Sequence, residues 1–142
     1  MMTPEIRQKL KSLLTTHESY RQFPYADSTG HLTIGIGRNL SDRGISTTEA
    51  LALLDDDIFY FTSKLANVLP YFSELSDNRQ IVLVDMCFNL GVNGLLEFHK
   101  MLDAIEARDW EKAAFEILNS KAAHQDVNRY EQLAYIMKTG NL

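Results

Sequence analysis

The 142-residue sequence contains little cysteine and proline, and it has no long apolar run. A single cysteine, Cys87, excludes an internal disulfide and a metal cage of several cysteines. No window approaches the roughly 18 consecutive apolar residues of a transmembrane helix, so no membrane insertion is expected. The opening residues, MMTPEIRQKLKSLL, have no long apolar segment and no small-residue cleavage site. We therefore expect synthesis in the cytoplasm without a signal peptide.

The sequence also lacks a basic stripe. Its net charge is −5, and residues 46–77 hold six acidic side chains against one basic side chain. This distribution excludes nucleic acid as an expected partner and does not favour binding to anionic membranes. The four histidines, at positions 17, 31, 99 and 124, show no metal-ligand spacing, so neither a metal nor a cofactor is expected.

The residues that are present indicate a soluble α+β domain with a mainly helical chain. Thr3-Pro4-Glu5 is typical of a helix start, and an apolar stripe at helical spacing follows it. From Phe23 to Ile45, short alternating segments separated by turn residues predict a small antiparallel sheet. Ser46-Thr47-Thr48-Glu49 matches a capping box and opens a long helix that lasts until Pro70.

The rest of the chain is predicted to be helical. Ile81–Leu90 is apolar on nearly every side, which favours a buried helix with Cys87 as a core residue, and the sequence GVNG interrupts it at Gly91. Further helices are expected at about 97–107, 110–119 and 126–139, with Gly140 as the last stop. We thus expect one domain, 1–142, with a sheet-bearing lobe (about 15–50), a connecting helix (about 46–69) and a helical lobe (about 70–142 plus 3–17).

Glu18 is the first candidate for chemistry. The stripe of the first helix ends at Leu14, which puts Glu18 at or just past the negative end of the helix dipole. That field favours a protonated carboxyl group, as a general acid needs. The alternative is a surface glutamate paired with Arg21.

Asp27 is the second candidate. Asp27-Ser28-Thr29-Gly30 matches a type I turn, so the aspartate could be purely structural. In the following segment, 31–37, strict alternation would put Thr33, Gly35 and Gly37 on one nearly bare face, which suggests close approach of a ligand; a bent strand is the alternative. Two carboxylates in unlike environments beside an open strip would suit glycoside hydrolysis.

These residues resemble the phage-type lysozyme (endolysin) family. The similarity lies in the order Glu18, Asp27, Thr33 within D-x-x-G-x-x-T-I-G-I-G, and it continues in Phe88-Asn89-Leu90-Gly91 and Asn128-Arg129 over nearly the whole chain. The resemblance implies a lysozyme-like fold and a muramidase that cleaves the β-1,4 bond between N-acetylmuramic acid and N-acetylglucosamine, with inversion.

By the same resemblance, Glu18 is the general acid, and Asp27 and Thr33 hold the attacking water. The glycan would be bound by Gly35, Asn89 and Arg129, and Arg129 would reach back to Glu18. Two alternatives remain open. A lytic transglycosylase would not need Asp27 to position water, and a catalytically dead peptidoglycan-binding remnant would not need all three catalytic residues.

The chain departs from the family at two positions. The family commonly has an aromatic residue before the last helix, where this chain reads Ser120-Lys121-Ala122-Ala123-His124. Arg38 follows the Gly-Ile-Gly sequence where the family's best-known member has histidine, and alignment suggests an ion pair between Arg38 and Asp57. The resemblance also implies a monomer whose partner is the peptidoglycan glycan strand, and a holin that releases the protein to the cell wall or periplasm.

Overall fold

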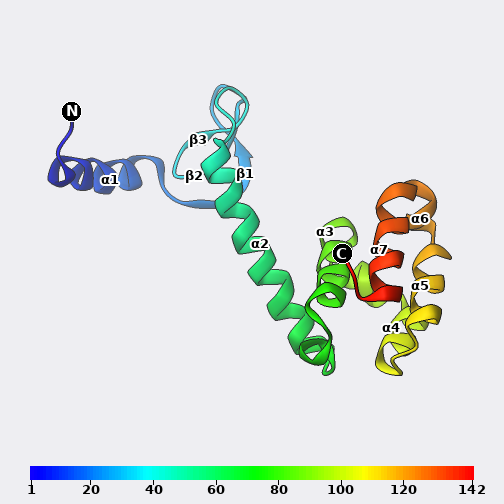
Figure 1. Cartoon of the computed structure of the whole chain (residues 1–142). Helices are drawn as coiled ribbons and strands as arrows, with labels where there is room; N and C mark the ends of the chain where they lie inside the picture. Colours follow the sequence, from blue (N-terminus) through cyan, green and yellow to red (C-terminus); the bar gives the residue numbers. More distant parts are fainter. The chain divides into compact units, whose positions relative to one another are not determined.

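The computed structural model describes residues 1–142, and the chain divides into unit 1, Met1–Leu53, and unit 2, Leu54–Leu142 (Figure 1). Seven α-helices and a small antiparallel sheet confirm the expected mainly helical α+β class. The expected grouping of residues 3–17 with the helical lobe stays a prediction, because it concerns the placement of one unit against the other.

Helix α1, Pro4–Glu18, opens unit 1. The Thr3 side chain caps it by accepting a hydrogen bond from the Ile6 backbone N–H at 3.3 Å, and Pro4 occupies the first helical position, as the sequence predicts. The helix ends at Glu18, which confirms that this acid lies at the helix C-terminus. None of the helix's residues is buried.

The sheet of unit 1 has the order β1-β2-β3, with β1 Arg21–Ala26, β2 Leu32–Gly35 and β3 Arg38–Asn39. The Asp27–Gly30 turn joins β1 to β2 and is closed by a hydrogen bond from the Gly30 N–H to the Asp27 carbonyl at 3.0 Å. This confirms the expected turn and the antiparallel sheet.

The expected alternation through Gly37 is wrong. Strand β2 ends at Gly35, and Ile36 and Gly37 form the turn to β3, with positive φ angles of 68° at Gly35 and 70° at Gly37. Glycine adopts these angles at little steric cost, so the Gly-Ile-Gly sequence makes a turn and the chain leaves the strand. Thr33, expected on the nearly bare face, is buried, whereas Leu32 and Ile36, which would alternate with it, are exposed.

Helix α2, Thr47–Val68, begins at the expected capping box. The Glu49 backbone N–H donates to the Ser46 hydroxyl at 3.1 Å, and the Ser46 backbone N–H donates to Glu49 Oε1 at 2.8 Å. The expected Arg38–Asp57 pair is wrong, because Arg38 forms a two-pronged ion pair with Glu49 and also donates to the Gly44 carbonyl. An acid already fixed at the start of α2 is the closer partner for Arg38.

Unit 2 is helical throughout. A 3-10 turn, Phe72–Glu74, precedes α3, Asp77–Leu96, and Gly91 (φ 74°, ψ 166°) kinks α3 where the sequence predicts a break. The later helices are α4 His99–Glu106, α5 Trp110–Leu118, α6 Lys121–Gln125 and α7 Val127–Thr139. The short helix α6 is not expected from the sequence. Helix α7 packs against α3, α5 and α6 (Figure 1).

The apolar core lies in unit 2, from Leu65 to Met137. Cys87 is fully buried in it, and burial raises the pKa of its thiol to about 11, which confirms its expected role as a core residue. No single helix is long and apolar enough to cross a membrane, although the bent pair α3 and α4 meets that criterion by length and composition.

Candidate active site

The Glu18 carboxyl group lies over the turn between β2 and β3. A Cβ atom placed on Gly37 would come within 2.9 Å of Glu18 Cγ, Cδ and Oε2. Glycine at position 37 therefore leaves room for the acid, and the exposed end of α1 presents it to solvent. Glu18 makes no ion pair with Arg21, whose guanidinium lies 4.4 Å from the centre of the Tyr25 ring.

Asp27 is held by three donors on a single oxygen. Its Oδ1 accepts from the Thr29 N–H at 2.9 Å, from the Thr29 hydroxyl at 2.8 Å and from the His31 N–H at 2.8 Å. The His31 backbone donor, followed by the Thr29 hydroxyl, lowers the pKa of Asp27 below its ordinary value. Asp27 is therefore a carboxylate at neutral pH, and its other oxygen, Oδ2, accepts none of these hydrogen bonds.

His31 extends this network beyond the turn. Its Nδ1 contacts the Thr29 hydroxyl and lies 3.7 Å from Asp27 Oδ2, and its Nε2 lies 3.3 Å from Asp42 Oδ2. The Thr29 hydroxyl donates its single hydrogen to Asp27, so it accepts from His31. The position of Asp27 thus depends on Thr29 and His31, two residues that the sequence marks only as part of a turn and a strand.

Thr33 lies in the middle of β2 and is the one buried residue of unit 1. Its hydroxyl donates to the His31 carbonyl at 3.0 Å, which leaves the oxygen lone pairs of Thr33 as acceptors. Two positions further along, Gly35 pairs with Arg21, and a Cβ atom placed on Gly35 would meet nothing within 4 Å. The open space expected beside this strand is therefore found at Gly35, whereas Glu18 fills it at Gly37.

The strand register orders these groups along β2. Glu18 lies at the Gly37 end, and Asp27 follows Ala26, which pairs with Leu32 at the other end. At a strand rise of roughly 3.3 Å per residue, β2 separates the two acids by a distance on the order of 10 Å. Unit 1 thus brings together Glu18, Asp27, Thr33 and Gly35, four of the six site residues expected from the sequence.

The other two expected residues lie in unit 2. Arg129, in the first turn of α7, donates from Nε to Asp85 Oδ1 at 2.8 Å and from Nη2 to the Asp85 carbonyl at 3.1 Å. Asn89, one turn after Asp85 on α3, is exposed, and its Oδ1 accepts from the Tyr130 hydroxyl at 2.6 Å. In each of these two contacts, the paired residues lie more than 40 positions apart in the sequence. The expected reach of Arg129 to Glu18 stays a prediction, since it involves both units.

Arg129 and Asp85 also border an open groove of about 550 Å³ in unit 2. Its apolar wall is formed by α2 and α3 residues, namely Leu54, Ile58, Ile81, Val84 and Phe88. A cation held at the edge of an apolar groove is suited to a ligand that carries both polar and apolar groups.

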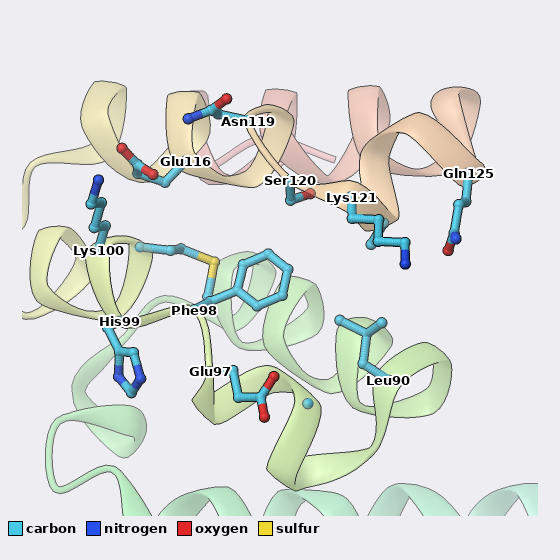
Figure 2. A pocket seen from close by; sticks show the side chains of 13 residues that line it. Leu90, Glu97, Phe98, His99, Lys100, Glu116, Asn119, Ser120, Lys121 and Gln125 are labelled. Carbon is cyan, nitrogen blue, oxygen red and sulfur yellow. The ribbon is translucent and has the colours of Figure 1, made fainter.

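A second pocket of unit 2, about 600 Å³, lies where the family's aromatic residue is missing. Ala122 lines it, and Figure 2 shows Phe98 in its centre between Leu90 and the segment of Ser120 and Lys121. Ala122 is itself buried, so α6 packs on unit 2 without an aromatic side chain there. No three His, Cys, Asp or Glu side chains come together to hold a metal ion.

The chain is similar to known proteins over most of its length. A family model described as phage lysozyme matches residues 15–132. Probable T4-type lysozymes 1 and 2 of Dictyostelium discoideum are 26% and 25% identical to the chain, over 94% of this chain and 95% of each relative. The pre-baseplate central spike protein Gp5 of Enterobacteria phage T4 is 27% identical over 94% of this chain, which covers 28% of that protein.

Proposed function

The chain belongs to the phage lysozyme family and is a glycoside hydrolase that acts on peptidoglycan, and from this premise we propose that it is an inverting muramidase. The bond cleaved is the β-1,4 linkage between N-acetylmuramic acid and N-acetylglucosamine. Glu18 donates a proton to the leaving oxygen, while Asp27 and Thr33 hold the water that attacks the anomeric carbon.

The geometry of Asp27 carries this proposal. Three donors on Oδ1 keep the group ionised and fixed, and Oδ2 is left to accept a hydrogen from water. The hydrogen bonds that hold Asp27 in the turn all go to Oδ1, and His31 Nδ1 lies 3.7 Å from Oδ2. The free lone pairs of the Thr33 hydroxyl offer a second acceptor for the same water.

The order of groups along β2 supports inversion. Inverting glycosidases separate their two carboxyl groups by roughly 6.5–9.5 Å, which leaves room for water, whereas retaining enzymes hold them at roughly 5–5.5 Å. Placement of Glu18 and Asp27 at opposite ends of a four-residue strand favours the wider spacing. An ionised, fixed Asp27 also favours hydrolysis over lytic transglycosylation, because a transglycosylase has no water to position.

The test is a mass spectrum of the muropeptides that the protein releases from purified peptidoglycan. Free reducing N-acetylmuramic acid ends are expected, and proton NMR during the reaction should show the α-anomer first. Anhydro products would replace the proposal with transglycosylation, and no products from folded protein would indicate a binding remnant. The Glu18→Gln variant should lose roughly 10²–10⁴-fold in kcat, while its melting temperature stays unchanged because Glu18 is exposed.

We also propose that the protein works as an endolysin. It would be made in the cytoplasm, pass to the periplasm through a holin, and act on the wall as a monomer. Co-expression with and without a holin tests this: lysis should require both proteins and an intact Glu18. Light scattering that found a stable oligomer would contradict the monomer.

A further inference from the structure

The His31 ring lies between groups from two separate loops of unit 1. Its Nδ1 contacts the Thr29 hydroxyl and lies 3.7 Å from Asp27 Oδ2, in the turn between β1 and β2. Its Nε2 lies 3.3 Å from Asp42 Oδ2, in the segment that follows β3. Asp27 and Asp42 are the charged side chains that pair with the ring, and both are acidic. The ring therefore bridges the proposed catalytic carboxylate and a second carboxylate that the proposed reaction does not use.

The hydrogens available in this cluster determine which form of the ring fits. Asp27 is ionised and has no hydrogen to give, so the Thr29 hydroxyl donates its single hydrogen to Asp27 Oδ1, at 2.8 Å. The His31 Nδ1 must then be a donor to the Thr29 oxygen. Nε2 faces an oxygen of the Asp42 carboxylate, which can only accept, so it also needs a hydrogen. Only the doubly protonated, positively charged ring satisfies both contacts together.

Asp42 is itself fixed by the third strand of the sheet. Its Oδ2 accepts a hydrogen bond from Asn39 Nδ2 at 3.1 Å, and its backbone N–H donates to Asn39 Oδ1 at 3.0 Å. Asn39 lies on β3 opposite Thr33, the other residue proposed to hold the attacking water. A chain of contacts therefore leads from the β2–β3 pair, at the level of Thr33, to the carboxylate of Asp27.

We propose that Asp42 is a positioning residue for Asp27, and that it acts through a relay formed by the doubly protonated His31 ring and the Thr29 hydroxyl. In this relay, Asp42 holds the ring with Nδ1 as a donor toward Thr29. A ring without a hydrogen on Nδ1 would accept the Thr29 hydrogen itself, and Asp27 Oδ1 would keep two donors in place of three. The proposal rests on the proposed function, in which Asp27 holds the attacking water.

The pH profile of kcat/KM separates the relay from a direct effect of charge. Removal of the Asp42 charge would, on its own, lower the pKa of Asp27, because a negative neighbour is lost. Loss of the relay raises that pKa, because Asp27 loses the Thr29 donor. Asp42→Ala should therefore move the acid limb of the profile to higher pH. An acid limb that stays in place or moves to lower pH would overturn the proposal.

The separate values of kcat and KM give a second measurement on the same variant. The relay acts on the residue that holds the attacking water, so Asp42→Ala should lower kcat and leave KM nearly unchanged. Because the Asp42 side chain is exposed, the loss of kcat should be roughly 1.5-fold to fivefold, the range expected of an exposed ion pair. A rise in KM with an unchanged kcat would instead indicate a role in binding and would overturn the proposal.

A double-mutant cycle shows whether the effect of Asp42 passes through the Thr29 hydroxyl. In the Thr29→Val background the relay is already broken, so Asp42→Ala should cause no further loss of kcat. A further loss of the same size would show that Asp42→Ala disturbs its loop by another route, and it would overturn the proposal.

The ring is tested with a matched pair of histidine variants. His31→Leu removes the link between Asp42 and Thr29 and should lower kcat roughly threefold to tenfold, the effect of one net hydrogen bond. His124→Leu is the control, because His124 is an exposed histidine of unit 2 whose Nδ1 contacts the Ser120 carbonyl. The control should keep the kcat of the wild type, and an equal kcat in the two variants would overturn the role of the His31 ring.

Failure of the relay and failure of the proposed function give different results. Carbon-13 NMR of the Asp27 carboxyl group measures its pKa without turnover, in the wild type and in Asp42→Ala. Hydrolysis by the wild-type chain, with an Asp27 pKa that is unchanged or lower in Asp42→Ala, would keep the muramidase and overturn the relay. A higher Asp27 pKa in Asp42→Ala, with no hydrolysis by the wild-type chain, would keep the relay and overturn the proposed function.

Discussion

The two units of this chain are stabilised in different ways. Unit 2 encloses an apolar core of more than twenty buried side chains between Leu65 and Met137. Unit 1 buries Thr33 and no apolar residue, and its loops are fixed by polar contacts: the donors on Asp27, the capping box at Ser46 and the ion pair of Arg38 with Glu49. The proposed catalytic groups lie in unit 1, where hydrogen bonds hold the side chains of Asp27 and Thr33.

The largest effect should come from the core of unit 2. Leu83→Ala removes a fully buried side chain and should lower the free energy of unfolding by about 2–5 kcal/mol, through lost burial and the cavity left behind. Leu32→Ala, at a half-exposed position of β2 in unit 1, should cost much less. Urea unfolding of both variants measures the free energy of unfolding, and an equal loss of stability in the two variants would contradict the distinction between the units.

A smaller effect, on activity, is expected at the two glycines of the β2–β3 turn. Ala is strained at positive φ in both positions, by roughly 1–2 kcal/mol, so Gly35→Ala and Gly37→Ala should lower stability alike. Only the new Cβ at position 37 meets Glu18, whose flexible side chain must move away. We expect the kcat of Gly37→Ala to be roughly tenfold to hundredfold lower than the kcat of Gly35→Ala. Equal kcat values would show that the contact with Glu18 has no role.

Removal of one donor to Asp27 should change the pH dependence of activity. Thr29→Val deletes the hydroxyl that lowers the pKa of Asp27, so that pKa rises and the acid limb of the kcat/KM profile moves to higher pH. At the optimum, kcat/KM should fall roughly threefold to tenfold. Thr29→Ser keeps the donor and should restore the profile; an acid limb identical in wild type and Thr29→Val would contradict the role of this hydroxyl.

The smallest effect is expected from the ion pair of unit 1. Arg38, and then the Ser46 backbone, lower the pKa of Glu49 from 4.5 to about 2, so the stabilisation is fully present above pH 4.5 and is lost as the pH falls toward 2. Glu49→Gln should therefore flatten the dependence of the melting temperature on pH across that window. The control is Glu131→Gln, which replaces an exposed acid that has no ion pair. An equal flattening of the pH dependence in this control would contradict the stabilising role of the Arg38–Glu49 pair.

Local features of this fold could be predicted from the sequence. The cap at Thr3, the capping box at Ser46, the turn at Asp27 and the break at Gly91 each depend on residues within four positions of one another. The same holds for Glu18, because the apolar stripe of α1 fixes where that helix ends. The catalytic candidates of unit 1 were therefore accessible from local chemistry together with the family resemblance.

The errors come from choices that local sequence does not determine. Glycine in Gly35-Ile36-Gly37 fits a bare strand and a turn equally well, and only the φ angles of the folded chain separate the two. Alignment suggested Asp57 as the partner of Arg38, and the capping residue Glu49 proved to be its partner. The partners of Arg129 and Asn89 lie on other helices, so tertiary packing alone reveals them.

The burial of Cys87 has a practical consequence for spectroscopy. Thiol-reactive labels attack the thiolate, and a fully enclosed sulfur whose pKa is raised to about 11 offers almost none of it at neutral pH. Cysteines introduced at the exposed positions Ser28 and His124 should therefore accept a pair of probes without any change at position 87. The native chain is in effect a cysteine-free background, so resonance energy transfer or electron spin resonance can measure the distance between the two probes with and without added peptidoglycan fragments.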